Sequence, residues 1–399
     1  MQQTLTTKNR IESIDILRGI VMVLMALDHV RDYFHIAANI DDPLNLATTT
    51  PLLYFTRWIT HFCAPVFVFL SGISIYLQSL RKTKNELSIF LIKRGLWLIF
   101  IEVIIVSLAW TFLPTYNFVP FQVIWTIGIS MVILGGVIQL PYKIILMLGL
   151  LIVCGHNLLD IPEARPGFKA GFWWDLLHHG NFAMYPFAPN HSIVIVYPFL
   201  AWTGLMILGY CIGILFTSTY DTHQRRKKLM WIGFGLIAFF ILVRFINRYG
   251  DPHPWSVQKN TLFTILSFLK IHKYPPSLLY MCITIGPALL LLPFLEKVNN
   301  GFTKRIIVFG RVPLFYYILH IYLIHFICTI NFFARGHTMQ DAIGGLNNHP
   351  FMFLVPGEGY GLAIVYLIWL VVVVLLYPLC KWYDRYKTIH REKWWLSYL

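Results

Sequence analysis

The chain has 399 residues, of which 57% are hydrophobic and only 13% are charged. A water-soluble domain carries roughly a quarter charged residues, so this composition excludes a purely soluble protein. A net charge of +14 could indicate a nucleic-acid-binding protein. In a membrane protein, however, such a charge reflects cationic cytosolic loops and contact with anionic lipid. We therefore expect the lipid bilayer, and no nucleic acid, to be the partner of the basic residues.

Apolar runs long enough to cross a hydrocarbon core of about 30 Å recur along the sequence. They are too long and too continuously apolar for barrel strands, so the sequence predicts an all-α, polytopic bundle of about ten transmembrane helices. No internal repeat interrupts the pattern, and residues 1–399 are predicted to form a single transmembrane domain. The predicted spans are 14–36, 54–80, 94–113, 120–140, 143–161, 193–216, 229–247, 277–295, 306–330 and 358–380.

Lys and Arg are concentrated in alternate connecting segments, as in 81–94, 225–228 and 381–393. Because these residues favour the cytosolic side of a membrane, both termini are predicted to be cytosolic. The longest segments on the opposite side are 162–192, 248–276 and 331–357. Residues 261–270 are apolar but too short to span, and they predict an interfacial helix on the outer surface.

The densest group of ionisable residues closes the first predicted span, and such residues inside a membrane are usually functional. Four of them follow i, i+3, i+4, i+7 spacing on one helix face: Asp28, Arg31, Asp32 and His35. His29 is turned about 100° away and lies about 22 Å along the helix from Ile14, in the outer half. A carboxylate on one imidazole nitrogen leaves the other as a base, so Asp28 or Asp32 is predicted to orient a catalytic His29. The alternative is a solvated helix end with ordinary ion pairs.

The second span brings Arg57, Trp58 and His61 to the same outer region, before a Pro65 that is expected to kink the helix. Together the two helices are predicted to line a polar cavity that opens outward. Arg57 and Trp58 are its candidate substrate-binding residues, and His61 is a further catalytic candidate. The alternative is an interfacial anchor made of Arg and Trp.

On the inner side, three arginines at or inside spans adjoin glycines that permit close helix approach: Arg18, Arg94 and Arg311. They are predicted to hold the phosphates of a phosphorylated cytosolic ligand, and His320, near mid-span, is included in this site. The alternative is that they bond helix-end carbonyls or pair with Asp15 and Glu102. Most histidines lie in the outer half, but no pair has the spacing of a metal motif, so no metal is predicted. His178 and His179 are interpreted as surface loop residues.

Four segments resemble a large group of bacterial membrane proteins related to the catalytic domain of lysosomal heparan-α-glucosaminide N-acetyltransferase. They are RIESIDILRGIVMVLMALDHVRDYF at the start, RWITHFCAPVFVFLSG at 57–72, GRVPLFYYILHIYLIH at 310–325 and the closing KWYDRYKTIHREKWWLSYL. The first is the most specific, and the resemblance spans nearly the whole chain. It extends more distantly to membrane acyltransferases that modify surface polysaccharides.

The resemblance implies transmembrane acyl transfer in a bacterial inner membrane. Acetyl-CoA from the cytosol would be the donor, and a sugar or similar acceptor would receive the acetyl group on the other side. The family uses a histidine near the end of the first span, which matches His29 or, allowing a gap, His35. The lysosomal enzyme carries Asn where His29 stands and its active histidine slightly later, so the two roles are open to exchange. It also has an extra span and a lumenal part that this sequence lacks.

Three questions stay open at this point. Intramembrane Asp and His residues also suit a proton-coupled secondary transporter, although the sequence shows no repeat halves. The acyl group is transferred either directly or through an acetyl-histidine, and the sequence fits both routes. A homodimer is compatible with the sequence, which does not identify the acceptor.

Overall fold

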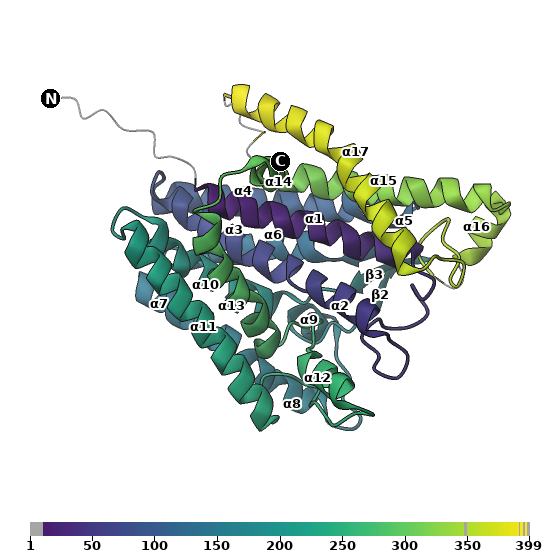
Figure 1. Cartoon of the computed structure of the whole chain (residues 1–399), viewed down its shortest axis with the longest axis horizontal. Helices are drawn as coiled ribbons and strands as arrows, with labels where there is room; N and C mark the ends of the chain where they lie inside the picture. Colours follow the sequence, from purple (N-terminus) through teal and green to yellow (C-terminus); the bar gives the residue numbers. More distant parts are fainter. Residues whose placement is uncertain (1–10, 347–348, 391, 394–395, 397–399) are drawn as a thin grey trace.

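The computed structural model describes residues 11–346, 349–390, 392–393 and 396 (Figure 1). It is mostly helical. Within this part of the chain, seven helical segments are long and apolar enough to cross a membrane. They are α2 (Pro51–Thr60) with α3 (Cys63–Ser79), α7 (Tyr142–Gly155) through η2 (His156–Leu159) to α8 (Asp160–Glu163), α10 (Phe199–Ile212) with η3 (Gly213–Phe216), α11 (Thr222–Ile246), α13 (Leu278–Leu295), α15 (Pro313–Ala334) and α17 (Leu362–Ile389).

The remaining long helices are α1 (Glu12–Phe34), α6 (Val123–Val137), and α4 (Lys84–Ile101), which continues through the π-helix η1 (Glu102–Val106) into α5 (Ser107–Thr111). Shorter ones are α9 (Phe172–Leu177), α12 (Thr261–Leu269), α14 (Gly301–Arg311) and α16 (Met339–Gly345). The prediction of a helical membrane bundle is confirmed. The count of ten spans and the cytosolic termini stay predictions, and the first ten residues lie outside the described part.

A small sheet corrects the prediction that the chain is purely α-helical. Its strands β1 (Phe118–Phe121), β2 (Ala183–Ala188) and β3 (His191–Ile195) lie in the order β1-β3-β2. Two predicted spans, 120–140 and 193–216, therefore begin too early, because their first residues are extended and pair in parallel. Pro120 has no N–H to give to a ladder, and the edge position of β1 accommodates it.

The predicted span 306–330 is also wrong, because two helices replace it. α14 ends at Arg311 and α15 begins at Pro313, with Val312 at φ −128° between them. Proline lacks the N–H that would continue the first helix but is well suited to the first turn of the next. The interruption separates the amphipathic helix α14 from the long apolar helix α15.

The second predicted span breaks as expected near Pro65, at His61 and Phe62 between α2 and α3. Proline at position 65 removes the hydrogen bond that would otherwise end on the carbonyl oxygen of His61. That carbonyl accepts a hydrogen bond of 2.7 Å from the hydroxyl of Tyr280, on α13. The break thus ties the middle of this span to α13.

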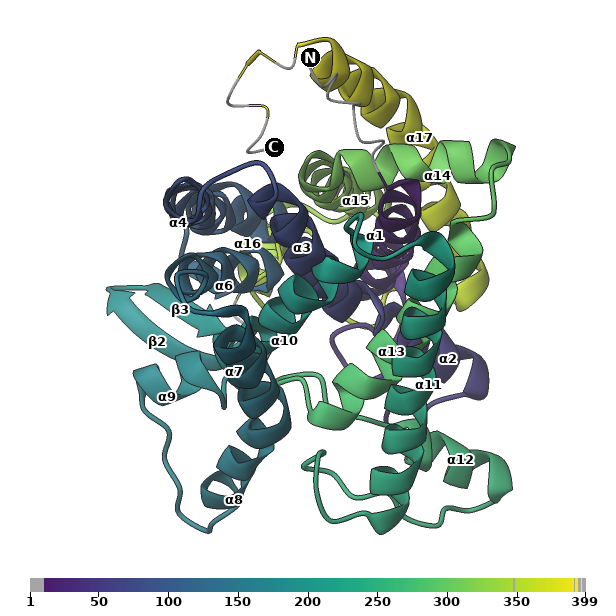
Figure 2. The same cartoon turned by 90° about the vertical axis from the view of Figure 1, so that its left-hand side faces the viewer.

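Helix α1 lies inside the bundle, against α3, α13, α14, α15 and α17 (Figures 1 and 2). Two glycines allow its closest contact, because a Cβ at Gly310 would lie 1.8 Å from the backbone oxygen of Asp15. A Cβ at Gly19 would lie 2.2 Å from the backbone oxygen of Ile306. The prediction that glycines beside the arginines permit close helix approach is confirmed here, and α1 is held at fixed depth between its neighbours.

Candidate active site

Two histidines from distant parts of the chain meet inside the bundle. Nδ1 of His29, on α1, lies 2.7 Å from Nε2 of His320, on α15. The two rings stack at a centroid distance of 4.9 Å. His320 is fully buried, whereas His29 is half-buried. Each helix presents its histidine to the other, so the pair depends on the packing of α1 against α15.

The hydrogen bonds of this pair fix its tautomers. Nδ1 of His320 lies 3.0 Å from the backbone oxygen of Tyr316, which can only accept, so this nitrogen carries a hydrogen. In a neutral ring Nε2 of His320 is then an acceptor, and Nδ1 of His29 donates to it. Nε2 of His29 is left with a lone pair and no hydrogen-bond partner among the described residues. This is the electronic state that a general base requires.

Two aromatic rings flank His29 edge-on. The ring centroid of Trp110, on α5, lies 4.8 Å from that of His29 at an interplanar angle of 73°. The ring of Tyr317, on α15, lies 6.3 Å away at 81°. Both rings are therefore roughly perpendicular to the imidazole. His29 thus lies between two aromatic rings that carry polar donors at their edges.

Asp28 does not hydrogen-bond to His29, contrary to one of the predicted roles. Its buried carboxylate lies 2.9 Å from Nη1 of Arg31 and accepts a 2.8 Å hydrogen bond from the hydroxyl of Thr60. It also pairs with Arg57 on α2, and Nζ of Lys273 lies 4.0 Å away. Three cations from three parts of the chain thus surround one carboxylate, which connects α1 with α2 and the outer loop.

Asp32 and His35 also lie apart from the histidine pair. Asp32 pairs with Arg31 at 2.5 Å and keeps 40% of its side chain exposed. His35 caps the end of α1, where its Nδ1 accepts a 3.2 Å hydrogen bond from the backbone of Ala37. The structure therefore brings Asp28, Arg31 and Asp32 together as one ion-pair cluster, as their spacing predicts, and orients His29 through His320 instead.

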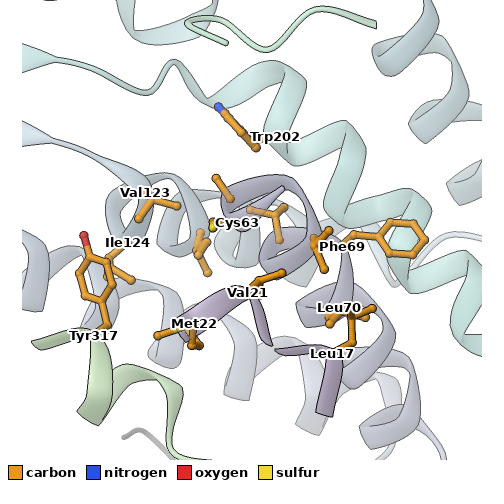
Figure 3. Packing of buried hydrophobic residues seen from close by; sticks show 14 of the residues in the cluster. Leu17, Val21, Met22, Cys63, Phe69, Leu70, Val123, Ile124, Trp202 and Tyr317 are labelled. Carbon is orange, nitrogen blue, oxygen red and sulfur yellow. The ribbon is translucent and has the colours of Figure 1, made fainter. Parts of the chain in front are cut away.

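A cavity of about 300 Å³ lies on the side of the bundle that is predicted to be cytosolic, and we call it the inner cavity. The three predicted arginines meet at it: Arg18, Arg94 and Arg311, together with Lys387 of α17. Its other walls are mostly apolar. Figure 3 shows five of its lining residues close together: Met22, Cys63, Val123, Ile124 and Tyr317. Tyr317 belongs both to this cavity and to the surroundings of His29, so the cavity ends beside the histidine pair.

Arg18 makes the contacts foreseen as the alternative, whereas Arg311 pairs with two carboxylates that were not foreseen. Arg18 bonds the carboxylate of Asp15 at 3.0 Å, the backbone oxygen of Gly310 at 3.2 Å and the hydroxyl of Ser74 at 2.8 Å. Arg311 lies 3.6 Å from Asp384 and 3.7 Å from the exposed carboxylate of Glu12. These long ion pairs hold the guanidinium of Arg311 loosely, whereas that of Arg18 is fixed. His320 does not line this cavity.

A second cavity, of about 700 Å³, lies on the opposite side. Its lining includes Arg57, His61, Lys270, Lys273 and Tyr274. Burial raises the pKa of the Tyr274 phenol, but the charges of Lys273 and Arg57 outweigh it, so the pKa lies below its usual value. Nδ1 of the buried His61 has no hydrogen-bond partner among the described residues. The wall of this outer cavity therefore carries more cationic side chains than its one carboxylate, Asp42, and an unused polar atom.

Of the two predicted substrate-binding residues, only Arg57 lies at the outer cavity. Arg57 lines the outer cavity and holds Asp28. Trp58 does not line it, and its indole N–H instead donates to the backbone oxygen of Leu269 at 3.3 Å. Trp58 thus fastens α2 to α12, the helix predicted for residues 261–270.

His178 corrects the interpretation of a surface loop. It is fully buried, 3.2 Å from Nδ1 of His156 and 2.9 Å from the carboxylate of Glu163. Donor atoms of Asp160, Glu163 and His178 lie within 4.8 Å of one another, a spacing that suits a metal ion. Glu163 is already engaged by His178 and by the indole N–H of Trp174, and we assign no metal to this group.

Sequence analysis missed the roles of four side chains near the histidine pair and the ion-pair cluster. Lys273, Trp110 and Tyr317 were not singled out, and His320 was assigned to the donor site. Their sequence signal is weak, since an aromatic residue or a histidine in an apolar run usually belongs to a packed core. An intramembrane histidine at 320 is the one clue, because such a residue needs a partner.

The apolar spanning helices define an integral membrane protein, and they enclose a histidine pair with one cavity that ends beside it at Tyr317. The family model of the heparan-alpha-glucosaminide N-acetyltransferase catalytic domain matches residues 10–246. The chain therefore belongs to this family of membrane acetyltransferases, as its sequence motifs indicate. The match contains His29, Arg57 and Arg94, while His320 and Arg311 lie beyond it. A comparison with curated proteins finds no match.

Proposed function

We propose that this protein transfers an acetyl group from cytosolic acetyl-CoA to a sugar or similar acceptor on the extracytoplasmic side of a bacterial inner membrane. The observation that carries the proposal is the position of the histidine pair. The inner cavity ends beside His29 at Tyr317, and Arg57 and Lys273 on the wall of the outer cavity pair with Asp28, the residue before His29 in α1. In this proposal the acceptor passes that ion-pair cluster, so a reaction at His29 draws one substrate from each side.

The inner cavity suits the donor. Coenzyme A carries phosphates that cannot enter lipid, and the basic residues at this cavity supply bidentate and point-charge partners for them. Arg18, Arg94 and Arg311 are the proposed phosphate ligands, with Lys387 beside them at the same cavity; Arg18 also bonds Asp15 and Gly310. The apolar walls beyond them suit the pantetheine arm, which would deliver the thioester to the end of the cavity near Tyr317.

The outer cavity suits the acceptor. The hydroxyl or amine of the acceptor would approach His29. Nε2 of His29 would remove the proton of this group as its oxygen or nitrogen attacks the thioester carbonyl. The carbon–sulfur bond then breaks, and the CoA thiolate takes the proton from the imidazolium. His320 supports this step because its acceptor nitrogen holds the hydrogen on Nδ1 of His29, and thereby keeps the lone pair on Nε2. Direct transfer of this kind needs no covalent histidine.

The test compares two histidines at the end of the same helix. His29→Gln keeps side-chain hydrogen bonding but cannot take the proton, so transfer of label from acetyl-CoA to membrane extracts should fall about 10²- to 10⁴-fold. Binding of acetyl-CoA should be unchanged. His35→Ala, which removes only a side-chain hydrogen bond to the backbone of Ala37 outside the pair, should keep most of the activity.

Three other results would change the assignment. If His35→Ala is inactive and His29→Gln is active, the catalytic base is His35 and not His29. Normal turnover in both variants would refute histidine catalysis at this helix end. If purified protein forms no acetylated product and instead moves protons with a solute, the transporter alternative holds.

A further inference from the structure

Two buried hydrogen-bond donors beside His29 make no hydrogen bond of standard geometry to the described residues: the hydroxyl of Tyr317 and the indole N–H of Trp110, which lies near that hydroxyl. Tyr317 is only 2% exposed and Trp110 only 6%. Leaving a buried donor unpaired is costly, so native structures contain few such groups and they need an explanation. Two of them next to one candidate base suggest a shared purpose.

Their placement favours a role in the reaction. Both rings stand edge-on to His29, at 4.8 Å for Trp110 and 6.3 Å for Tyr317. Tyr317 also lines the inner cavity, and Figure 3 shows its ring reaching from α15 with its hydroxyl toward Ile124 and Val123 of α6. The two donors therefore come from different helices, α5 and α15, and flank the base at the end of the donor cavity.

We propose that the Tyr317 hydroxyl and the Trp110 indole N–H form the oxyanion hole of this enzyme. The proposal rests on the proposed function. When the acceptor attacks the thioester carbonyl, its proton passes to Nε2 of His29 and the carbonyl oxygen becomes negatively charged. The two neutral donors stabilise that charge until the carbon–sulfur bond breaks and the thiolate recovers the proton. Such donors act without reorganisation, which makes them effective in a water-poor site.

The place beside His29, and not the unpaired donor alone, argues for a role in the reaction, since Trp125, Trp202, Tyr316 and Tyr383 also lack a partner among the described residues. A buried tyrosine or tryptophan that serves packing alone usually gives its polar atom to a nearby carbonyl. Other residues of this protein do so, since Tyr33 donates to the backbone oxygen of Trp110 at 2.5 Å and Tyr54 to that of Leu266 at 2.8 Å. Tyr317 and Trp110 keep their donors unused where a carbonyl oxygen of the substrate is expected.

The first test measures turnover with acetyl-CoA as the probe and water as the acceptor, using full-length protein in nanodiscs. Tyr317→Phe and Trp110→Phe remove one donor each and should lower kcat about 10²- to 10³-fold, with little change in the affinity for acetyl-CoA. The matched controls are Tyr383→Phe and Trp125→Phe, which remove buried and equally unpaired donors away from His29. They should keep normal turnover.

The second test reads the carbonyl directly and does not depend on turnover. Infrared difference spectra of bound acetyl-CoA labelled with ¹³C at the acetyl carbonyl should show a stretch below that of free acetyl-CoA. Tyr317→Phe should move the band back toward the free value, and Tyr383→Phe should not. An unshifted band in the wild-type complex, or the same band and kcat in Tyr317→Phe, overturns the proposal.

The two proposals fail in different ways. Normal turnover in Tyr317→Phe with a loss in His29→Gln overturns the oxyanion hole alone. Normal turnover in His29→Gln removes the base but leaves the infrared test of the oxyanion hole intact. Absence of acetyl-CoA binding to the wild-type protein overturns the proposed function and this assignment with it.

Discussion

Replacing Asp28 by Asn should destabilise the protein strongly, because its carboxylate is only 8% exposed and neutralises several buried cations. Arg31 retains Asp32 at 2.5 Å when the charge is removed. Arg57 loses its ion-pair partner, and Lys273 loses a carboxylate 4.0 Å away. Removing one member of a buried ion pair costs about 3–5 kcal/mol, because the other charge stays buried. We expect the free energy of unfolding to fall by about this amount.

Denaturant titration of the protein in detergent micelles, followed by tryptophan fluorescence, measures this loss. Asp32→Asn is the matched control, because its side chain is 40% exposed and the pair with Arg31 is partly screened; it should cost about 1 kcal/mol or less. Combining Asp28→Asn with Arg57→Gln should cost less than the sum of the single changes, because both remove the same interaction. A stable Asp28→Asn variant, or full additivity in the double variant, would refute the reasoning.

Three further predictions concern the donor site, the packing and the topology. Arg94→Ala should weaken binding of acetyl-CoA, more so at low ionic strength, whereas changes in 225–228, away from the cavity, should have little effect; equal losses would contradict the assigned donor site. Gly310→Ala should prevent folding, since its Cβ would lie 1.8 Å from a backbone oxygen, whereas Gly235→Ala meets nothing within 4 Å and should be neutral or stabilising in a melting experiment. A topology reporter at the C-terminus should read cytosolic and one near Gly180 external; the reverse pattern would overturn the predicted orientation.

The sequence predicts features that depend on local pattern. The length of the apolar runs identifies the spanning helices. Ionisable residues are rare inside spans, which is why Asp28 and His29 stand out in the sequence. The glycines beside the arginines correctly indicate close packing. Pro313 carries a signal for the break between α14 and α15, but the surrounding apolar run favours one continuous span. Helical spacing accounts for these successes and for this error.

Contacts between distant segments were not predictable in this way. Residue spacing within α1 offers Asp32 as the partner of His29, yet the actual partner is His320, 291 residues away. The three cations around Asp28 likewise come from α1, α2 and the loop before α13. The small sheet pairs segments whose apolar residues fit a helix equally well. Which side chains face each other across helices is decided by packing, and packing is not periodic in the sequence.

The central claim is that donor and acceptor reach His29 from opposite sides of the membrane. Proteoliposomes with the protein in one known orientation allow a direct measurement, with labelled acetyl-CoA on one side only and an extract of surface saccharides as the acceptor on the other. The account predicts labelled acceptor only when acetyl-CoA faces the side of Arg94 and Arg311, and none with His29→Gln. Labelled acceptor formed equally with both substrates on the same side, or with acetyl-CoA supplied only to the outer cavity, would contradict it.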